Sequence, residues 1–176
     1  AAALHCTVDK NMYDKILVTR PIIPLGNDIG FLPGDKDSKL SNWMQPVFDN
    51  LQLLIPEPEG KKTRRVTPEM LLQAGRIELE AITYIRGRSI PRQYIIIDEA
   101  QNLTPHEVKT VISRAGDGTK IILTGDPGQI DNPYLDGSSN GLSYVAERLK
   151  GNGLHGHIIL RKSERSELAA LAAKSL

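Results

Sequence analysis

Two neighbouring carboxylates, Asp98 and Glu99, follow directly after the apolar run at 94–97, "YIII". A short apolar run of this kind is typical of a strand that is buried on both faces of a parallel sheet. Ligands of such sheets bind at the carboxyl edge, where the two acids are expected to emerge. Because neighbouring strand residues point to opposite sides of a sheet, we expect different roles for them. Asp98 would bind Mg²⁺, directly or through water, and Glu99 would orient and polarise an attacking water; the alternative is that both acids cap the following helix.

A second group of candidate residues follows the next apolar run, in the stretch "LTGDPGQID" at 123–131. Gly125, Asp126 and Gln129 are predicted to leave the same edge of the sheet as the two acids. Gln129 would then approach the ligand of the two acids or its attacking water. The alternative for this stretch is an ordinary glycine-rich turn.

These residues need elements that hold them at one edge, and the rest of the sequence predicts such elements. Strands are expected at 15–20, 77–82, 94–97, 120–125 and 156–160. Helices are expected at 1–10, 38–55, 67–75, 104–116, 138–151 and 163–176. Thr104 and Pro105 begin a helix in the usual way, as do Thr67 and Pro68, and Pro46 marks a kink or a break. Strands that alternate with helices predict an α/β fold, with a mostly parallel sheet and helices on both of its faces.

Composition restricts the class of protein further. The 176 residues suit a single domain, 40% are hydrophobic, 24% are charged, and the net charge is +1. This charge does not indicate a nucleic-acid binder, so any basic surface would be local. Cys6 is the sole cysteine, which fits a reducing compartment, and no apolar run approaches the ~20 residues that cross a bilayer. We therefore expect a cytoplasmic protein that does not act in a membrane.

The motifs resemble those of a known family. Four apolar residues before Asp98 and Glu99 are similar to the Walker B pattern of P-loop nucleotide hydrolases, and "DEAQ" at 98–101 resembles the superfamily-one helicases. Three longer stretches resemble the PhoH-like ATPases, close to the type that is fused to an N-terminal PIN nuclease domain: "VTRPIIPLGNDIGFLPGDKDSK", "ITYIRGRSIPRQYIIIDEAQNLTP" and "SERSELAALA". The resemblance implies a RecA-like P-loop NTPase core, ATP and Mg²⁺ as cofactors, a homo-oligomeric ring, and a role in RNA unwinding or RNA metabolism. It also implies that Gly125, Asp126 and Gln129 bind the nucleotide together with Asp98, and that Gln129 approaches the γ-phosphate or its attacking water and senses the γ-phosphate.

Several arginines are candidates for contacts with phosphate. Arg161 and Arg165 resemble the arginine that neutralises charge during phosphoryl transfer, and the alternative for them is surface ion pairing. Arg86 and Arg88 precede the strand of the two acids, and they would contact RNA phosphates or the nucleotide, or pair with acids. Arg20 lies in a stretch that resembles a helicase segment in contact with single-stranded nucleic acid, and the alternative is a packed loop.

One expected motif does not occur in these residues. No G-x-x-x-x-G-K-[ST] run, which would supply the phosphate cradle, is found among the 176 residues. The resemblance places this loop just upstream of "AAALHCTV", so we interpret 1–176 as one domain that is truncated at its N-terminus and starts just after the phosphate-binding loop. We expect the full-length protein to hydrolyse ATP and this chain alone to be inactive.

Three functions are compatible with these residues. The leading hypothesis is ATP hydrolysis coupled to RNA remodelling or unwinding. The alternative is a nucleotide-dependent regulatory or assembly module that controls a partner nuclease. A non-catalytic oligomerisation scaffold is the third.

Overall fold

The structure is a computed structural model of the chain, and it describes residues 1–21, 44–55, 66–85, 87, 89–160 and 171. The chain divides into two compact units, Ala1–Val145 and Ala146–Leu176. The first unit holds the sheet and the candidate site. None of the helices in the described part of the chain has the length and apolarity that a bilayer crossing requires.

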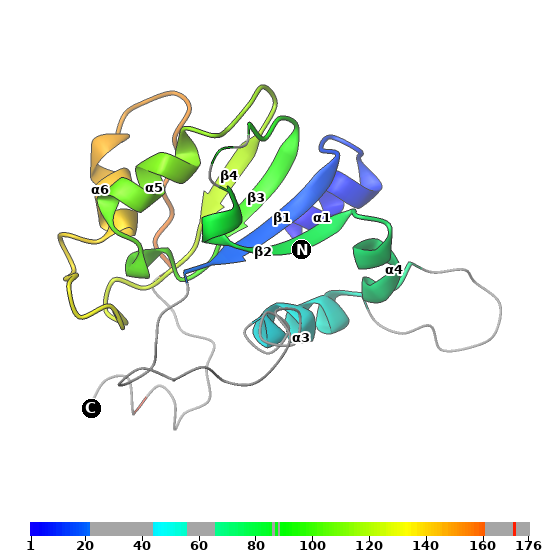
Figure 1. Cartoon of the computed structure of the whole chain (residues 1–176), viewed down its shortest axis with the longest axis horizontal. Helices are drawn as coiled ribbons and strands as arrows, with labels where there is room; N and C mark the ends of the chain where they lie inside the picture. Colours follow the sequence, from blue (N-terminus) through cyan, green and yellow to red (C-terminus); the bar gives the residue numbers. More distant parts are fainter. Residues whose placement is uncertain (22–43, 56–65, 86, 88, 161–170, 172–176) are drawn as a thin grey trace. The chain divides into compact units, whose positions relative to one another are not determined.

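The centre of the first unit is a parallel sheet of four strands (Figure 1). Its strands lie in the order β2-β1-β3-β4, and each neighbouring pair is parallel. Their bounds are β1 (Lys15–Arg20), β2 (Ile77–Ala81), β3 (Gln93–Ile97) and β4 (Lys120–Leu123). The predicted α/β class with a parallel sheet is confirmed, and β2 lies at an edge, as the alternation of "IELEA" indicates.

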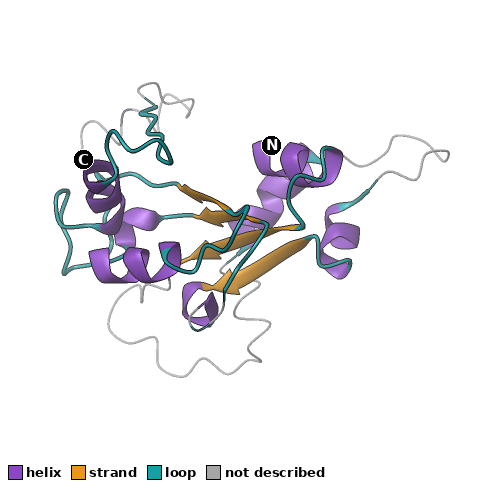
Figure 2. Ribbon diagram, turned by 90° about the horizontal axis from the view of Figure 1, so that it is seen from above, coloured by secondary structure: helices purple, strands orange, loops and turns teal. Residues whose placement is uncertain are grey.

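Alternate residues of the strands pack on opposite faces of the sheet, and helices cover both faces (Figure 2). On one face, Leu17 and Ile95 pack with Val108 of α5 (Pro105–Ile112) and Val145 of α6 (Gly141–Arg148). The other face packs against α1 (Ala2–Leu4), α3 (Gln45–Leu54) and α4 (Pro68–Gln73). Because both faces are buried, β1 and β3 are almost continuously apolar.

Helix starts agree with the capping residues in the sequence. Thr104 accepts a hydrogen bond from the backbone N of Glu107 (3.2 Å), and Glu107 accepts one from the backbone N of Thr104 (2.9 Å), which completes a capping box. Thr67 caps α4 with a longer bond, 3.3 Å from the backbone N of Met70. Pro46 lies in the first turn of α3, so it begins this helix rather than kinking it, while 38–43 lie outside the described residues.

Two of the differences from the expected elements concern the N-terminal helical segment and the end of α5. The N-terminal helical segment begins as α1 and continues as a π-helical stretch, η1 (His5–Asp9), instead of a single α-helix. The helix α5 ends at Ile112, and irregular turns lead from there to Gly116. Neither difference moves the strand ends that carry the candidate site.

The prediction of a strand at 156–160, "GHIIL", is wrong: these described residues of the second unit are not in a strand. The backbone there forms no ladder, and the side chains of Ile158 and Leu160 are 83% and 88% exposed. A β-branched apolar run becomes a strand only where a neighbouring strand accepts its hydrogen bonds. No described residue of this unit supplies such a neighbour. Of the predicted terminal helix, residue 171 is helical and the others lie outside the described residues.

Candidate functional site

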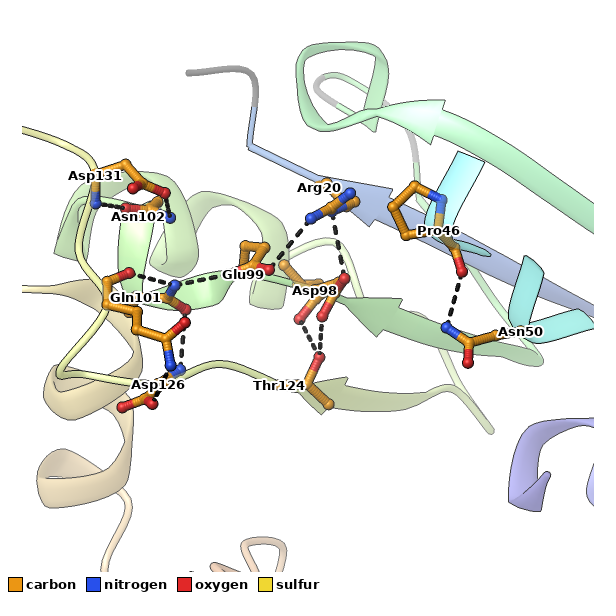
Figure 3. A network of polar contacts seen from close by, with 12 residues as sticks. Arg20, Pro46, Asn50, Asp98, Glu99, Gln101, Asn102, Thr124, Asp126 and Asp131 are labelled. Carbon is orange, nitrogen blue, oxygen red and sulfur yellow. Dashed lines mark hydrogen bonds and ion pairs between the residues drawn. The ribbon is translucent and has the colours of Figure 1, made fainter. Parts of the chain in front are cut away.

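Three side chains meet where neighbouring strands end together. Thr19 of β1, Ile97 of β3 and Leu123 of β4 are register partners. The next residues along these strands are Arg20, Asp98 and Thr124, and the backbone N of Asp98 still donates to the carbonyl of Thr19 at 2.9 Å. In parallel strands, residues at the same level point to the same side, so the three side chains lie next to one another (Figure 3). This is the carboxyl edge of the sheet.

Both carboxylate oxygens of Asp98 have partners. The hydroxyl of Thr124 donates to Oδ1 at 2.8 Å, and Nε of Arg20 lies 3.3 Å from Oδ2. The Arg20 side chain is 16% exposed, whereas that of Asp98 is 35% exposed. Asp98 therefore remains accessible to a ligand while its orientation is fixed by two strands.

Glu99 adopts a left-handed backbone conformation, with φ 54° and ψ 38°. This conformation costs a non-glycine residue roughly 1–2 kcal/mol. It also turns the side chain, so that Nη2 of Arg20 donates to Oε1 of Glu99 at 3.2 Å. The expectation that Asp98 and Glu99 point to opposite sides is therefore wrong, because the strand has already ended at Ile97. Both carboxylates share one cationic neighbour.

Gln101 connects the acids to the turn that follows β4. Its Nε2 donates to Oε2 of Glu99 at 2.7 Å and to the carbonyl of Gln129 at 2.8 Å, and its Oε1 accepts from the backbone N of Asp126 at 3.2 Å. The side chain is fully buried, which is rare for a glutamine that does not have such partners. The acids and the turn are thus joined by one amide group.

The turn itself is organised around Asp126. Its Oδ1 accepts from the backbone N of Gly128 at 2.8 Å, and its Oδ2 accepts from Nε2 of Gln129 at 2.7 Å. The side chain of Gln129 is therefore exposed and held on Asp126, while its backbone carbonyl is held by Gln101. Gly125 precedes the turn in close contact with Gln101.

The structure thus brings together five predicted residues at one edge of the sheet: Asp98, Glu99, Gly125, Asp126 and Gln129. Arg161, Arg165, Arg86 and Arg88 lie outside the described residues. Arg20, predicted to contact nucleic acid, instead contacts both acids here. Its role toward nucleic acid stays a prediction.

Sequence reasoning missed Thr124 and Gln101, and it assigned Arg20 elsewhere. The signal for Arg20 and Thr124 is their place, at the last residue of β1 and one residue beyond β4, the two strands on either side of β3, but it requires the strand register. The signal for Gln101 is weaker, because a glutamine after two acids gives no indication that its side chain is buried.

The donor set fits Mg²⁺. Hard carboxylate oxygens are the ligands that this ion prefers, and sites of nucleotide enzymes need only one or two of them because phosphates and waters complete the shell. Asp98 and Glu99 already converge on one cationic group, the guanidinium of Arg20. Among the described residues, no group of three His, Cys, Asp or Glu side chains forms an all-protein cage.

Comparison with known proteins identifies the family. The model of a family described as PhoH-like protein matches residues 1–174. The chain belongs to the PhoH family. A PhoH family member of Bacillus subtilis, Protein PhoH2, is 57% identical over 176 residues, which are 100% of this chain and 39% of that protein. Protein PhoH2 of Mycolicibacterium smegmatis is 39% identical over 99% of this chain and 38% of its own length.

A second PhoH family member of Bacillus subtilis, called PhoH-like protein, is 39% identical over 78% of this chain and 40% of its own length. The chain therefore spans 38–40% of the length of these relatives. The four-stranded parallel sheet with helices on both faces is consistent with a P-loop NTPase-like PhoH domain.

Proposed function

We propose that this chain forms the metal-binding and water-orienting part of an ATPase in a longer PhoH-family protein. One observation carries the proposal. The side chains of Asp98 and Glu99 converge on the guanidinium of Arg20 at the carboxyl edge of a parallel sheet, beside the turn that contains Gln129. Ligands of such sheets bind at this edge. Membership of the PhoH family supports the same function.

The roles of the side chains follow from their positions. Asp98, which is fixed by Thr124 and remains accessible, would hold the metal ion. Glu99 would accept the proton of the attacking water or orient that water, as carboxylates at such sites do. Mg²⁺ held by Asp98 would supply positive charge that offsets the negative charge of the phosphates. Gln129, with Gly125 and Asp126, would contact the nucleotide at the γ-phosphate end.

Phosphoryl transfer also requires a charge-neutralising arginine and a phosphate-binding loop, and we propose that neither is among the site residues described above. Arg161 or Arg165 would neutralise charge in the transition state, in the same chain or across a subunit boundary. The phosphate cradle would come from sequence of the longer protein, because the 176 residues contain no such loop. For this reason we expect no ATP turnover by the 176-residue chain alone.

The test compares full-length protein with the 176-residue chain. Glu99→Gln in the full-length protein is expected to lower kcat by roughly 10²–10⁴-fold, because a positioned base contributes about that much. Asp98→Asn should raise the Mg²⁺ concentration needed for half-maximal turnover. Asp14→Asn is the matched control, since Asp14 is an exposed acid that pairs with Arg92 away from the site.

Two results would contradict the proposal. Turnover of Glu99→Gln within tenfold of the wild type would exclude Glu99 as the base. Metal-dependent hydrolysis by the 176-residue chain would show that it already contains a phosphate site.

We extend the proposal to coupling with RNA. The resemblance to helicase-like ATPases supports single-stranded RNA as partner, a homo-oligomeric ring, Arg20, Arg86 and Arg88 as contacts, and a cytoplasmic location in keeping with the lone Cys6. Turnover that RNA stimulates, together with strand displacement by the full-length protein, is the expected result. Hydrolysis that instead changes the activity of a PIN nuclease domain, without displacement, would favour the regulatory module.

A further inference from the structure

Gln101 is placed to do more than fill the core. Its amide has two N–H donors, and both are used, one by the Glu99 carboxylate and one by the carbonyl of Gln129. Its oxygen accepts the backbone N–H of Asp126. We infer that Gln101 is a positioning residue that couples the turn at 125–129 to the direction of the Glu99 side chain. The inference rests on the proposed function for its consequence in catalysis, but not for its geometry.

The neighbouring residue shows what a purely structural role looks like. Asn102 is also buried, and its Oδ1 accepts from the backbone N of Asp131 (2.8 Å) and of Asn132 (3.2 Å). These bonds hold the loop after the turn, and none of them reaches Glu99. Gln101, in contrast, binds an acid of the site and the turn of the site with the same planar group.

Gly125 gives an independent observation. A Cβ at this position would overlap Oε1 of Gln101 and would lie 3.2 Å from the backbone N of Ala100 and of Gln101. The backbone of Gly125 is not among the left-handed glycines, so space rather than conformation requires the glycine. The start of the turn is therefore packed directly on the amide that holds Glu99.

Gln101 therefore links the Glu99 side chain to the turn at 125–129. A ligand that moves the carbonyl of Gln129 or the N–H of Asp126 changes the bonds of Gln101, and Glu99 then keeps only its contact with Arg20 on the other oxygen. The left-handed backbone of Glu99 is unfavourable for a glutamate by itself, so contacts with surrounding residues must stabilise it. Gln101 thus keeps the proposed base aligned while the turn is in place.

The first test needs no nucleotide and uses the 176-residue chain. Gln101→Met keeps the length and volume of the side chain but removes its amide. The backbone N–H of Asp126 then loses its acceptor, so its hydrogen exchange, measured by NMR, should be roughly 5- to 30-fold faster. Asn102→Ala is the matched control: it should accelerate exchange at Asp131 and Asn132 and leave Asp126 unchanged.

The second test measures the coupling itself. Glu99→Ala should shift the backbone resonances of Asp126 and Gln129 in the wild-type background and leave them unshifted in the Gln101→Met background. Equal shifts in both backgrounds would overturn the inference, because the turn would then sense Glu99 by another route. Gly125→Ala provides a second variant that retains Gln101 but displaces its amide, and it should reproduce the faster exchange at Asp126.

The catalytic consequence is tested in the full-length protein. Gln101→Met should lower kcat by roughly 10- to 100-fold with KM for ATP little changed, since groups that orient a reacting residue contribute about this much. Asn102→Ala should leave both constants near those of the wild type. A rise in KM with kcat unchanged would overturn the positioning role. A wild-type protein without turnover would instead contradict the proposed function, and the two NMR measurements would still decide the coupling.

Discussion

Arg20 balances the charge of the candidate site, since its guanidinium lies against two carboxylates that follow one another in the chain. Two acids this close would otherwise repel each other. Arginine suits this place better than lysine, because its planar, delocalised guanidinium can lie against two carboxylates at once. At Arg20, Nε faces Asp98 and Nη2 faces Glu99.

Removal of this cation is expected to destabilise the fold. Arg20→Ala should lower the free energy of unfolding by about 1–3 kcal/mol, less than for a fully buried pair because both acids are partly exposed. Urea denaturation of the 176-residue chain at pH 7 measures it. Arg92→Ala is the control, because the pair of Arg92 with Asp14 is mostly exposed and is worth about 0–1 kcal/mol. Equal losses for the two variants would contradict a structural role of Arg20 between the acids.

At the scale of elements, the helix that follows the acids is fixed at its start by its cap. Thr104 and Glu107 exchange hydrogen bonds, whereas Thr67 of α4 makes one longer bond. The capping box therefore fixes the end of the segment that runs from Glu99 to α5. This segment contains Gln101 and Asn102, so the cap lies close in sequence to the residues that hold the turn.

The two caps give a comparison within one protein. Thr104→Ala should cost about 1–2 kcal/mol in the free energy of unfolding, and Thr67→Ala should cost less, because it removes one weak bond. Thermal or urea denaturation of both variants measures the order. A larger loss for Thr67→Ala would mean that the capping box contributes little here.

The turn before α6 contains a carboxylate with an unusual titration. Hydrogen bonds from the hydroxyl and backbone N–H of Ser138, and then from Ser139, lower the pKa of Asp136 from its ordinary 3.8 to about 2. Because the folded pKa is the lower one, the stabilisation is complete above pH 3.8 and is lost as the pH falls through about 2. Asp136 thus favours the turn at any pH where the protein is expected to act.

Substitution of the first partner tests this cause. Ser138→Ala removes the hydroxyl bond to Oδ1 but leaves the backbone bonds, so the pKa of Asp136 should rise and still remain below 3.8. An NMR titration of the Asp136 carboxyl carbon measures the midpoint. Ser113→Ala is the control, since that hydroxyl donates to the carbonyl of Thr110 at the end of α5. An unchanged midpoint in Ser138→Ala would contradict the assigned cause.

At the scale of the whole molecule, sequence predicts what depends on local pattern. The four strands of the sheet were predictable because apolar runs end at clear turn signals, and the acids and the glutamine turn were predictable because they follow two such runs. The contacts of Arg20 and Thr124 were not, since they depend on register, which is a property of strand pairs. The left-handed backbone of Glu99 and the burial of Gln101 depend on contacts between segments distant in sequence.

The strand predicted at 156–160 illustrates the same limit from the opposite side. Its composition favours a strand, but the described residues of its unit offer no partner for its backbone. Amino-acid composition alone therefore predicted a strand that the structure does not contain at 156–160. In the sheet, the same kind of apolar run is a strand because β1 and β4 lie on either side of β3.

The backbone of Glu99 has a practical consequence for protein engineering. Glycine adopts this left-handed conformation without steric cost, so a procedure that ranks substitutions by backbone fit would replace the acid. The resulting protein would have a relaxed backbone at position 99 but would lack the side chain on which hydrolysis is proposed to depend. Thermostabilised versions of this domain should therefore keep position 99 unaltered during optimisation.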